Sequence, residues 1–261
     1  MEFTNKTVLI TGSTSGIGLA IARDFASKGA NIVINGIGTS DDLQVISNTI
    51  SKDYGIRCLF SISNVLIPDQ IRLMIHNTII EFGSIDILVN NAGIQFVSPI
   101  ESFPEDKFNE IISINLISSF HTIKAVLPTM KKMGWGRIIN IASAHALIAS
   151  PYKAAYVSAK HGLAGLTKTV ALEVAELGIT CNAICPGYVW TPLVEKQIPD
   201  TMKARKLTKD QVIKSVFLAA QPTKKFVKME EVASLTAYLA SDLARSITGA
   251  LISIDGGWTA Q

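Results

Sequence analysis

Short apolar runs alternate along this chain with longer segments in which apolar residues recur every three or four positions. The first run, residues 7–10, is followed by a segment that places Ile17, Ile21 and Phe25 on one side, as an amphipathic helix does. Such runs separated by helical segments predict βαβ units and therefore parallel strands. Further strands are expected at 31–35, 56–61, 85–89, 137–141, 180–184 and 251–254. The helices between them are expected at 41–52, from Pro68 onward, after Pro104, from the Tyr156 region to about Leu177, and at 230–239.

This alternation predicts an α/β fold with one doubly wound, Rossmann-type parallel sheet and helices on both of its faces. The chain has 261 residues and carries no repeat, linker or low-complexity segment, so residues 1–261 are expected to form a single domain. Its hydrophobic content of 48% and mean hydropathy of +0.33 fit strands that are buried on both faces.

A polar and basic insertion interrupts the pattern between residues 192 and 228. From Asp200 to Lys228 eight Lys/Arg residues stand against two acids, a local charge of +6, which leaves −3 for the rest of a chain with net charge +3. A solvated helical face is the simpler explanation of such a run. The alternative is a helical lid over the substrate, whose positive field attracts an anion.

Several classes of protein are not expected from this composition. No stretch reaches about 18 uninterrupted apolar residues, the length of a transmembrane helix, and the first residues lack the features of a signal peptide. Cys58, Cys181 and Cys185 are odd in number and are interpreted as core thiols of a reducing cytoplasm, the last two sharing one expected strand. No Cys/His cluster has metal-ligand spacing, and a net charge of +3 is too small to indicate nucleic acid. We therefore expect a cytoplasmic protein without metal, membrane or nucleic-acid partners.

Tyr156 and Lys160 form the most informative pair in the chain. Four residues apart on an expected helix, they share one face about one turn from each other. A nearby ammonium favours the phenolate over the phenol, which ordinarily titrates near roughly pH 10, and so makes tyrosine a usable acid–base group. Taken alone, the pair is more typical of a solvated helix face than of a catalytic one.

A glycine-rich turn lies between the first expected strand and the first helix. Gly12, Gly16 and Gly18 stand at positions i, i+4 and i+6. Glycines let the backbone turn tightly and approach a pyrophosphate, while the helix N-terminus offers it free N–H groups. The turn follows a strand and opens a helix, which is the context that a dinucleotide site requires, although a structural glycine turn is the alternative.

The spacing of these glycines resembles the TGxxxGxG motif of the short-chain dehydrogenase/reductase family, and further motifs follow in the order typical of that family. Asn90–Gly93 matches its NNAG segment, Asn115 its helix asparagine, and Ser143 its catalytic serine. Pro186–Thr191 matches its PGxxxT segment. The resemblance covers nearly the whole chain and implies a nicotinamide cofactor and, as is common in the family, a homotetramer.

The resemblance also implies a role for each of four residues. Tyr156 would exchange a proton with the substrate's hydroxyl or carbonyl oxygen, and Lys160 would lower the tyrosine pKa and hydrogen-bond the nicotinamide ribose. Ser143 would hold the reacting oxygen, and Asn115 would position a water in a proton relay. A catalytic site is therefore expected at Asn115, Ser143, Tyr156 and Lys160.

The cofactor is expected to be NAD. Residues 35–39, at the end of the second strand, are where such a site reads the ribose 2′ position. They lack both the arginine expected for a 2′-phosphate and the aspartate common with NAD, and Ile37 suits a bare ribose better than a phosphate. Asn64 and Val65 stand where relatives place Asp-Val against the adenine, and the Asn64 carbonyl can still accept a hydrogen bond there. The residues expected at the cofactor are Gly12, Thr14, Ser15, Gly16, Ile17, Gly18, Ile37, Asn64, Val65, Asn91, Ala92, Gly93, Tyr156, Lys160, Pro186, Gly187, Val189 and Thr191.

Polar residues around the tetrad indicate an anionic substrate. Gln95, His145, Lys153 and Gln197 would together direct cationic and amide donors at one end of a small molecule, as a carboxylate demands. The set resembles that of family members acting on short 3-hydroxy acids, in which aromatic residues enclose the methyl end. Tyr188 stands where tryptophan is frequent in such members. The residues expected at the substrate are Gln95, Ser143, His145, Lys153, Tyr156, Tyr188, Gln197 and Trp258.

The expected activity is that of an NAD-dependent oxidoreductase of ketone body metabolism. It would interconvert (R)-3-hydroxybutyrate and acetoacetate, a small hydroxy acid and keto acid that are both anions, with Tyr156 as base in oxidation and as acid in reduction. Two alternatives stay open. One is a 3-oxoacyl thioester reductase or another NAD(P)-linked reductase of the same fold, and the other is a dinucleotide-binding regulatory protein without turnover.

Overall fold

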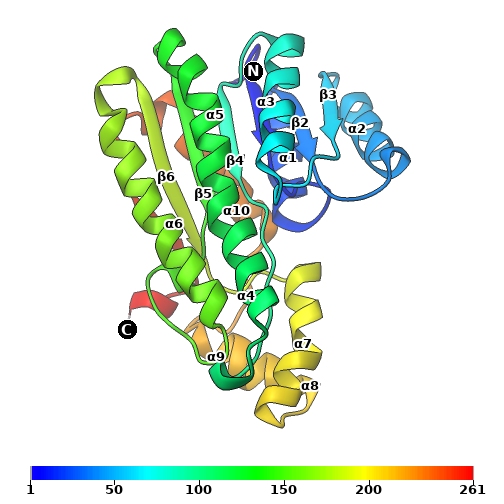
Figure 1. The fold of residues 1–261 in the computed structure, drawn as a ribbon, viewed down its shortest axis with the longest axis vertical. Coiled ribbons are helices and arrows are strands. Elements are labelled where there is room, and N and C mark those ends of the chain that lie inside the picture. Colours follow the sequence, from blue (N-terminus) through cyan, green and yellow to red (C-terminus); the bar gives the residue numbers. More distant parts are fainter. Residues whose placement is uncertain (1, 261) are drawn as a thin grey trace.

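The computed structural model describes residues 2–260 and contains one seven-stranded sheet in which every pairing is parallel. The strand order is β3-β2-β1-β4-β5-β6-β7, so the chain runs outward in both directions from β1 and β4 (Figure 1). This order confirms the predicted doubly wound fold. The strands are β1 (Thr7–Ile10), β2 (Asn31–Asn35), β3 (Cys58–Ser61), β4 (Ile87–Asn90), β5 (Gly136–Ile141), β6 (Ile179–Pro186) and β7 (Leu251–Ile254).

Helices cover both faces of the sheet because successive strand residues point to opposite sides. On β1, Val8 and Ile10 belong to the core that packs under α1 and α10, whereas Leu9 belongs to the core under α3 and α5. The helices are α1 (Gly16–Ser27), α2 (Ser40–Tyr54), α3 (Pro68–Phe82), α4 (Glu105–Ile112), α5 (Ser118–Met133), α6 (Ala154–Glu173), α7 (Pro192–Arg205), α8 (Lys209–Val212), α9 (Leu218–Ala220) and α10 (Met229–Ala240).

The strands β1, β2 and β7 have the predicted bounds, and the other strands differ from the predicted ones by a few residues. The third and fourth strands are shorter than expected, and β6 is longer, extending to Pro186. Helix α6 ends at Glu173 instead of near Leu177, and a single 3-10 turn, Ala175–Leu177, follows it. Cys181 and Cys185 both lie in β6 and, like Cys58, are buried free thiols, as predicted.

One helical stretch, Glu105–Met133, is long and apolar enough to cross a membrane by length and composition. It consists of α4, a π-helical segment (Ser113–Ile117) and α5. Val126 and Met130 on α5 are fully buried in the core between α5 and the sheet. Through these residues the stretch packs against the sheet as a helix of the domain.

The insertion at 192–228 folds into α7, α8, a second π-helical segment (Ile213–Phe217) and α9, which together occupy the far end of the molecule in Figure 1. Thr191 caps α7 by accepting a hydrogen bond from the Val194 N–H, and Pro192 opens the helix. A parallel bridge between Val189 and Val227 joins the two ends of the insertion. The basic segment is thus an ordered helical unit over the carboxyl ends of the strands.

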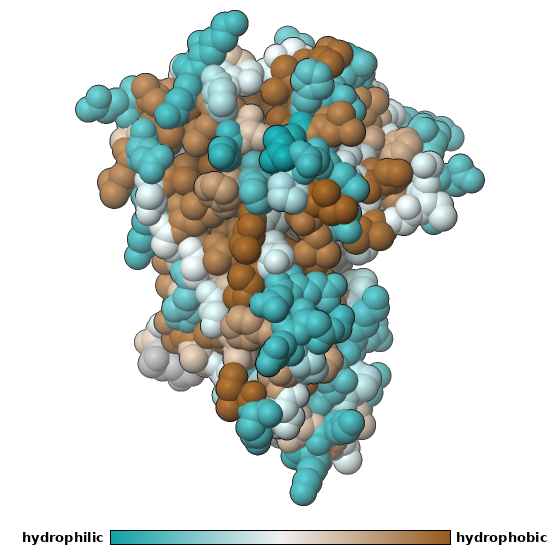
Figure 2. All heavy atoms as spheres, viewed as in Figure 1, coloured by the Kyte–Doolittle hydropathy of each residue, from teal (hydrophilic) through white to brown (hydrophobic). Residues whose placement is uncertain are grey.

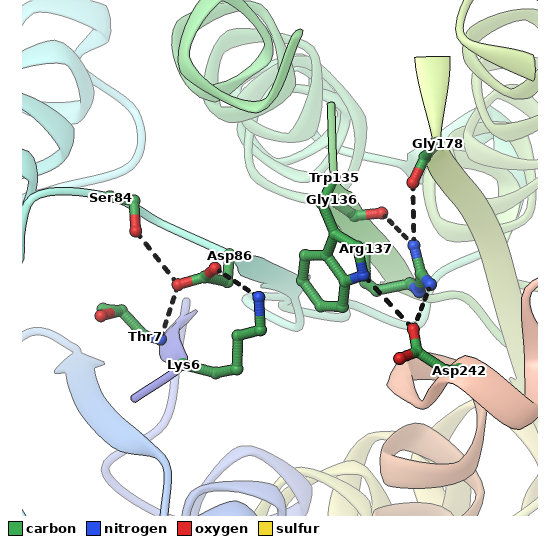
Figure 3. Close-up of polar contacts among 9 residues, drawn as sticks. All are labelled: Lys6, Thr7, Ser84, Asp86, Trp135, Gly136, Arg137, Gly178 and Asp242. Atoms are coloured by element: carbon green, nitrogen blue, oxygen red, sulfur yellow. Dashed lines mark hydrogen bonds and ion pairs between the residues drawn. The ribbon is translucent and has the colours of Figure 1, made fainter. Parts of the chain in front are cut away.

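A cluster of charged residues lies at the opposite, amino end of the strands, and Figure 3 shows it around the Trp135 ring. We call Lys6, Asp86, Trp135, Arg137 and Asp242 the amino-end cluster. Asp86 accepts hydrogen bonds from Lys6 Nζ at 3.1 Å, from the Thr7 N–H and from the Ser84 hydroxyl. Arg137 donates to Asp242 and to two backbone carbonyls.

The Trp135 ring lies against both cations of the amino-end cluster. Lys6 Nζ is 3.7 Å and the Arg137 guanidinium carbon 4.4 Å from the ring centroid, distances typical of cation–π contacts. The cluster therefore ties the starts of β1, β4 and β5 to the 3-10 turn that carries Asp242.

Candidate active site

The loops at the carboxyl ends of β1, β4, β5 and β6 surround a cavity of about 360 Å³. In doubly wound sheets this edge is where ligands bind. Of all the residues predicted for catalysis, cofactor and substrate, every one lines this cavity except Gly18, Asn64 and Asn115. Segments far apart in the sequence thus meet at the place that the motifs predicted.

The three exceptions lie behind the cavity wall. A Cβ on Gly18 would come within 2.5 Å of Asn91 Nδ2 and of the Gly12 carbonyl, so this glycine permits close packing of α1. The Asn64 side-chain carbonyl accepts the Leu66 N–H at 3.0 Å and so caps its own turn. The Asn115 amide exchanges two hydrogen bonds of 2.9 Å with the Ile94 backbone from within the π-helical segment. In this structure Asn115 therefore holds the loop after β4.

The glycine turn between β1 and α1 forms a cradle of backbone atoms. Gly12 has φ of +61°, and a Cβ there would lie 2.8 Å from the Ala92 Cα. The Asn91 amide donates to the carbonyls of Thr11 and Gly12, which fixes the turn against the loop after β4. The N-cap of α1, Ser15, makes no side-chain capping bond, so the first N–H groups of the helix stay free for an anion. These features fit the pyrophosphate of a dinucleotide.

The adenosine end of the cavity carries no cation among its described lining residues. Ile37 is 76% exposed beside it, and a Cβ on Gly36 would clash with the Thr14 methyl. Two basic residues that precede nearby strands are engaged elsewhere, because Arg57 pairs with Glu81 and Lys6 with Asp86.

The proton-transfer centre is formed by α6 and the end of β5. Tyr156 and Lys160 project from one face of α6, with Lys160 Nζ 5.6 Å from the tyrosine ring centroid. Lys160 donates to the Ile141 carbonyl at 2.8 Å, and Ser143 follows two residues later on the same strand end. The hydroxyl, phenol and ammonium thus converge on the cavity, as the sequence predicted.

Burial controls the acid–base properties of this centre. It raises the pKa of Tyr156 to about 12, an effect that the hydrogen bond with Ser143 only partly offsets. Burial also lowers the pKa of Lys160 to about 8. Loss of solvent on burial is the largest cause of the raised tyrosine pKa, because it disfavours the charged phenolate. At neutral pH Tyr156 is a phenol, ready to donate a proton.

The polar end of the cavity brings together Gln95, His145, Lys153 and Gln197. Gln95 Nε2 and both ring nitrogens of His145 are buried and have no hydrogen bond of standard geometry among the described residues, although the Ile148 backbone lies near enough to the imidazole to favour its protonation. Burial and the Lys153 charge lower the pKa of His145 to about 3, so the imidazole is neutral. Buried polar atoms are nearly always bonded in folded proteins, so unpartnered donors beside a buried ammonium point to an anionic ligand.

Aromatic rings form the facing wall of the cavity. Tyr188 stacks between Phe217 and Trp258, with ring centroids 4.5 Å and 5.2 Å away. The His145 ring meets Trp258 edge-on at 5.0 Å. Tyr188 and Trp258 thus both line the cavity.

Two residues of the insertion support this wall and were missed from the sequence. Phe217 is fully buried behind Tyr188. Gln221 is also fully buried, and its side chain accepts the Tyr188 N–H while donating to the Lys225 carbonyl. The apolar spacing of Val212, Val216 and Phe217 within the basic segment signals a buried helix face, but nothing local signals Gln221.

A nucleotide cradle, a buried tyrosine–lysine pair and a nearby serine on a parallel sheet define the class of nicotinamide-dependent oxidoreductases. Residues 12–259 match the family described as enoyl-(acyl carrier protein) reductase. The chain belongs to the short-chain dehydrogenase/reductase family, and it is an oxidoreductase.

Relatives of known name share nearly the full length. The chain is 59% identical over 98% of its length to D-beta-hydroxybutyrate dehydrogenase of Rhizobium meliloti (strain 1021), covering 99% of that protein. It is 47% identical to the protein of the same name from Cupriavidus necator, over 98% of both chains. The crystal structure of levodione reductase superposes with a TM-score of 0.91 at 33% identity, over 99% of both chains.

Proposed function

We propose that this enzyme interconverts (R)-3-hydroxybutyrate and acetoacetate with NAD. The observation that carries the proposal is the buried, unpartnered polar end of the cavity, where Gln95 and His145 face inward beside the Lys153 ammonium. A small substrate with a carboxylate supplies the missing acceptors. The names of the two relatives that match 98% of the chain support the same substrate.

In this proposal the chain's own residues hold the substrate and move one proton. In reduction the Tyr156 phenol donates its proton to the carbonyl oxygen, and Ser143 donates a hydrogen bond to the same oxygen. In oxidation the path reverses: Tyr156 first loses its own proton to solvent, and the resulting phenolate takes the hydroxyl proton. When bound, the nicotinamide supplies the hydride acceptor or donor. Lys160 stays 5.6 Å from the Tyr156 ring and supports its negative charge in the oxidative direction.

NAD is the proposed cofactor because the described lining of the ribose end offers no cation to a 2′-phosphate. The described cavity-lining residues include two lysines, Lys153 and Lys160, and both belong to the proton-transfer and polar ends. A phosphate beside Ile37 would lose water without gaining a counter-charge.

We also infer assembly into a homotetramer in the cytoplasm. Figure 2 shows apolar residues gathered over the face formed by α5 and α6, and exposed apolar side chains there include Phe120, Met133 and Leu172. Exposed apolar side chains gathered on one face are typical of subunit contacts. The three buried free thiols suit a reducing compartment.

The alternative of a 3-oxoacyl thioester reductase leaves the polar end without a use. A thioester is neutral where a free acid carries its carboxylate, and it would leave Lys153 facing an uncharged group. No described feature of the cavity favours it.

A cofactor and substrate panel tests the proposal. NADH or NADPH formation would be followed with (R)- and (S)-3-hydroxybutyrate, the methyl ester of the (R) acid and an (R)-3-hydroxyacyl thioester. We expect kcat/KM for the (R) acid with NAD to exceed that for its ester by about 100-fold, the range of one lost charge-assisted contact. Tyr156→Phe serves as the inactive control. A preference for the thioester, or for NADP, would overturn the proposal.

A further inference from the structure

Among the described residues that line the cavity, Lys153 is the cation of the polar end, and its surroundings are unusual for an ammonium group. It sits at the N-cap of α6 and is 7% exposed. Among the described residues, Lys153 Nζ donates a hydrogen bond to the Tyr188 hydroxyl, at 3.0 Å. A neutral phenol oxygen is thus the partner of a buried charge.

Other groups near Lys153 disfavour its charge. Arg205, at the end of α7, opposes it electrostatically and lies over the ring of Tyr152 at 5.5 Å. The neighbouring His145 is neutral, and no carboxylate lines the cavity among the described residues. Burial, with Arg205, lowers the pKa of Lys153 to about 8, so the ammonium persists at neutral pH by a narrow margin.

Contacts with both faces of the Tyr188 ring and with its backbone N–H hold the tyrosine in place. Phe217 and Trp258 stack on the two faces, and the backbone N–H is bonded to the buried Gln221 side chain. The tyrosine itself is 7% exposed. Burial raises its pKa above the ordinary range, so it stays a phenol that can accept from an ammonium.

We propose that the Tyr188 hydroxyl is a positioning group that keeps Lys153 charged and in place for the substrate carboxylate, an inference that rests on the proposed function. Before the acid binds, the phenol oxygen takes the place of a carboxylate oxygen as acceptor. When the acid binds, its carboxylate accepts a hydrogen bond from the same ammonium and supplies a full negative charge. A phenylalanine or tryptophan would keep the aromatic wall, but neither offers an oxygen acceptor.

Tyr188→Phe tests this role because it removes the acceptor and leaves the stacked ring. With lysine ε-carbons labelled with ¹³C, an NMR titration would follow Lys153, assigned by its absence in Lys153→Met. We expect the Lys153 midpoint to fall by about one pH unit, the size of a hydrogen bond to a charged group. For (R)-3-hydroxybutyrate, a midpoint moved from about 8 to about 7 raises KM about fivefold at pH 8 and leaves it nearly unchanged at pH 6. The value of kcat stays the same, because the bound carboxylate keeps Lys153 protonated.

Tyr152→Phe is the matched control. It also removes a tyrosine hydroxyl, from the residue that precedes Lys153, but it leaves the 3.0 Å hydrogen bond between Lys153 and Tyr188 intact. It should change neither the Lys153 midpoint nor KM. An unchanged Lys153 midpoint in Tyr188→Phe, or a KM increase of equal size at both pH values, overturns the inference. If the wild-type enzyme does not oxidise 3-hydroxybutyrate, the proposed function fails, and the NMR titration still decides whether Tyr188 keeps Lys153 charged.

Discussion

The two ends of the sheet treat charged residues in opposite ways. At the amino end, Lys6 and Arg137 each face a carboxylate, and both lie against one tryptophan ring (Figure 3). At the carboxyl end, Lys153 meets only a phenol, and neighbouring donors have no partner among the described residues. Paired charges stabilise the chain itself, whereas unpaired buried groups are stabilised only when a ligand arrives. Arg137 Nε at the amino end also lacks a partner among the described residues, so the contrast is between cations that face a carboxylate and one that does not.

The largest expected effect comes from removing the unpaired charge. Lys153→Ala should lower kcat/KM for (R)-3-hydroxybutyrate by about 100-fold, mainly through KM, because the substrate carboxylate then loses its buried counter-charge. Steady-state kinetics with the acid and its methyl ester would measure this, and the ester should lose little. Retention of the wild-type kcat/KM for the acid would show that the charge at this end has another purpose.

The paired end should respond in stability and not in catalysis. Asp86 is 3% exposed and accepts three hydrogen bonds, so Asp86→Asn should lower the free energy of unfolding by about 2 kcal/mol. Urea denaturation measures the loss, and kcat/KM of the folded enzyme should be unchanged.

Asp69→Asn on α3 provides the control for this variant. Asp69 pairs with Arg72 at the surface, where its side chain is 86% exposed, and ion pairs of this kind contribute roughly 0–1 kcal/mol. The contrast between the two ends would be wrong if Asp86→Asn cost no more than Asp69→Asn.

The motifs of this site are local in sequence, which is why they could be predicted. The glycine turn, Ser143 and the Tyr156–Lys160 pair each depend on spacing within one strand or helix, and the structure places them together. The alternation of strands and helices is local in the same sense, and it predicted the parallel, doubly wound sheet.

What the sequence could not predict depends on depth and on contacts between distant segments. Burial raises the pKa of Tyr156, and the degree of burial at the cavity is a property of the whole fold. Gln221 reaches Tyr188 only because the end of the insertion returns beside β6. The hydrogen bond between Lys153 and Tyr188 joins residues 35 positions apart for the same reason.

The smallest expected effect is an increase in the free energy of unfolding, and it tests the comparison between the two ends most directly. His145 is 3% exposed with both ring nitrogens unpartnered among the described residues, so His145→Phe should raise the free energy of unfolding by about 1 kcal/mol at pH 7. The ring contacts with Tyr156 and Trp258 remain available to phenylalanine. The same change should raise KM for the acid, because a donor to the substrate is lost.

The gain in stability should grow as the pH falls. The unfolded chain protonates His145 near pH 6.5, and the folded chain only near pH 3. Between these values the unfolded state binds more protons, so the wild-type enzyme loses stability as the pH drops below about 6.5. The phenylalanine variant lacks this loss, and urea titrations at pH 7 and pH 5 should show the difference between the two proteins widening. A variant that is less stable than the wild type at both pH values would mean that His145 is already satisfied without substrate, and the two ends of the sheet would then not differ in kind.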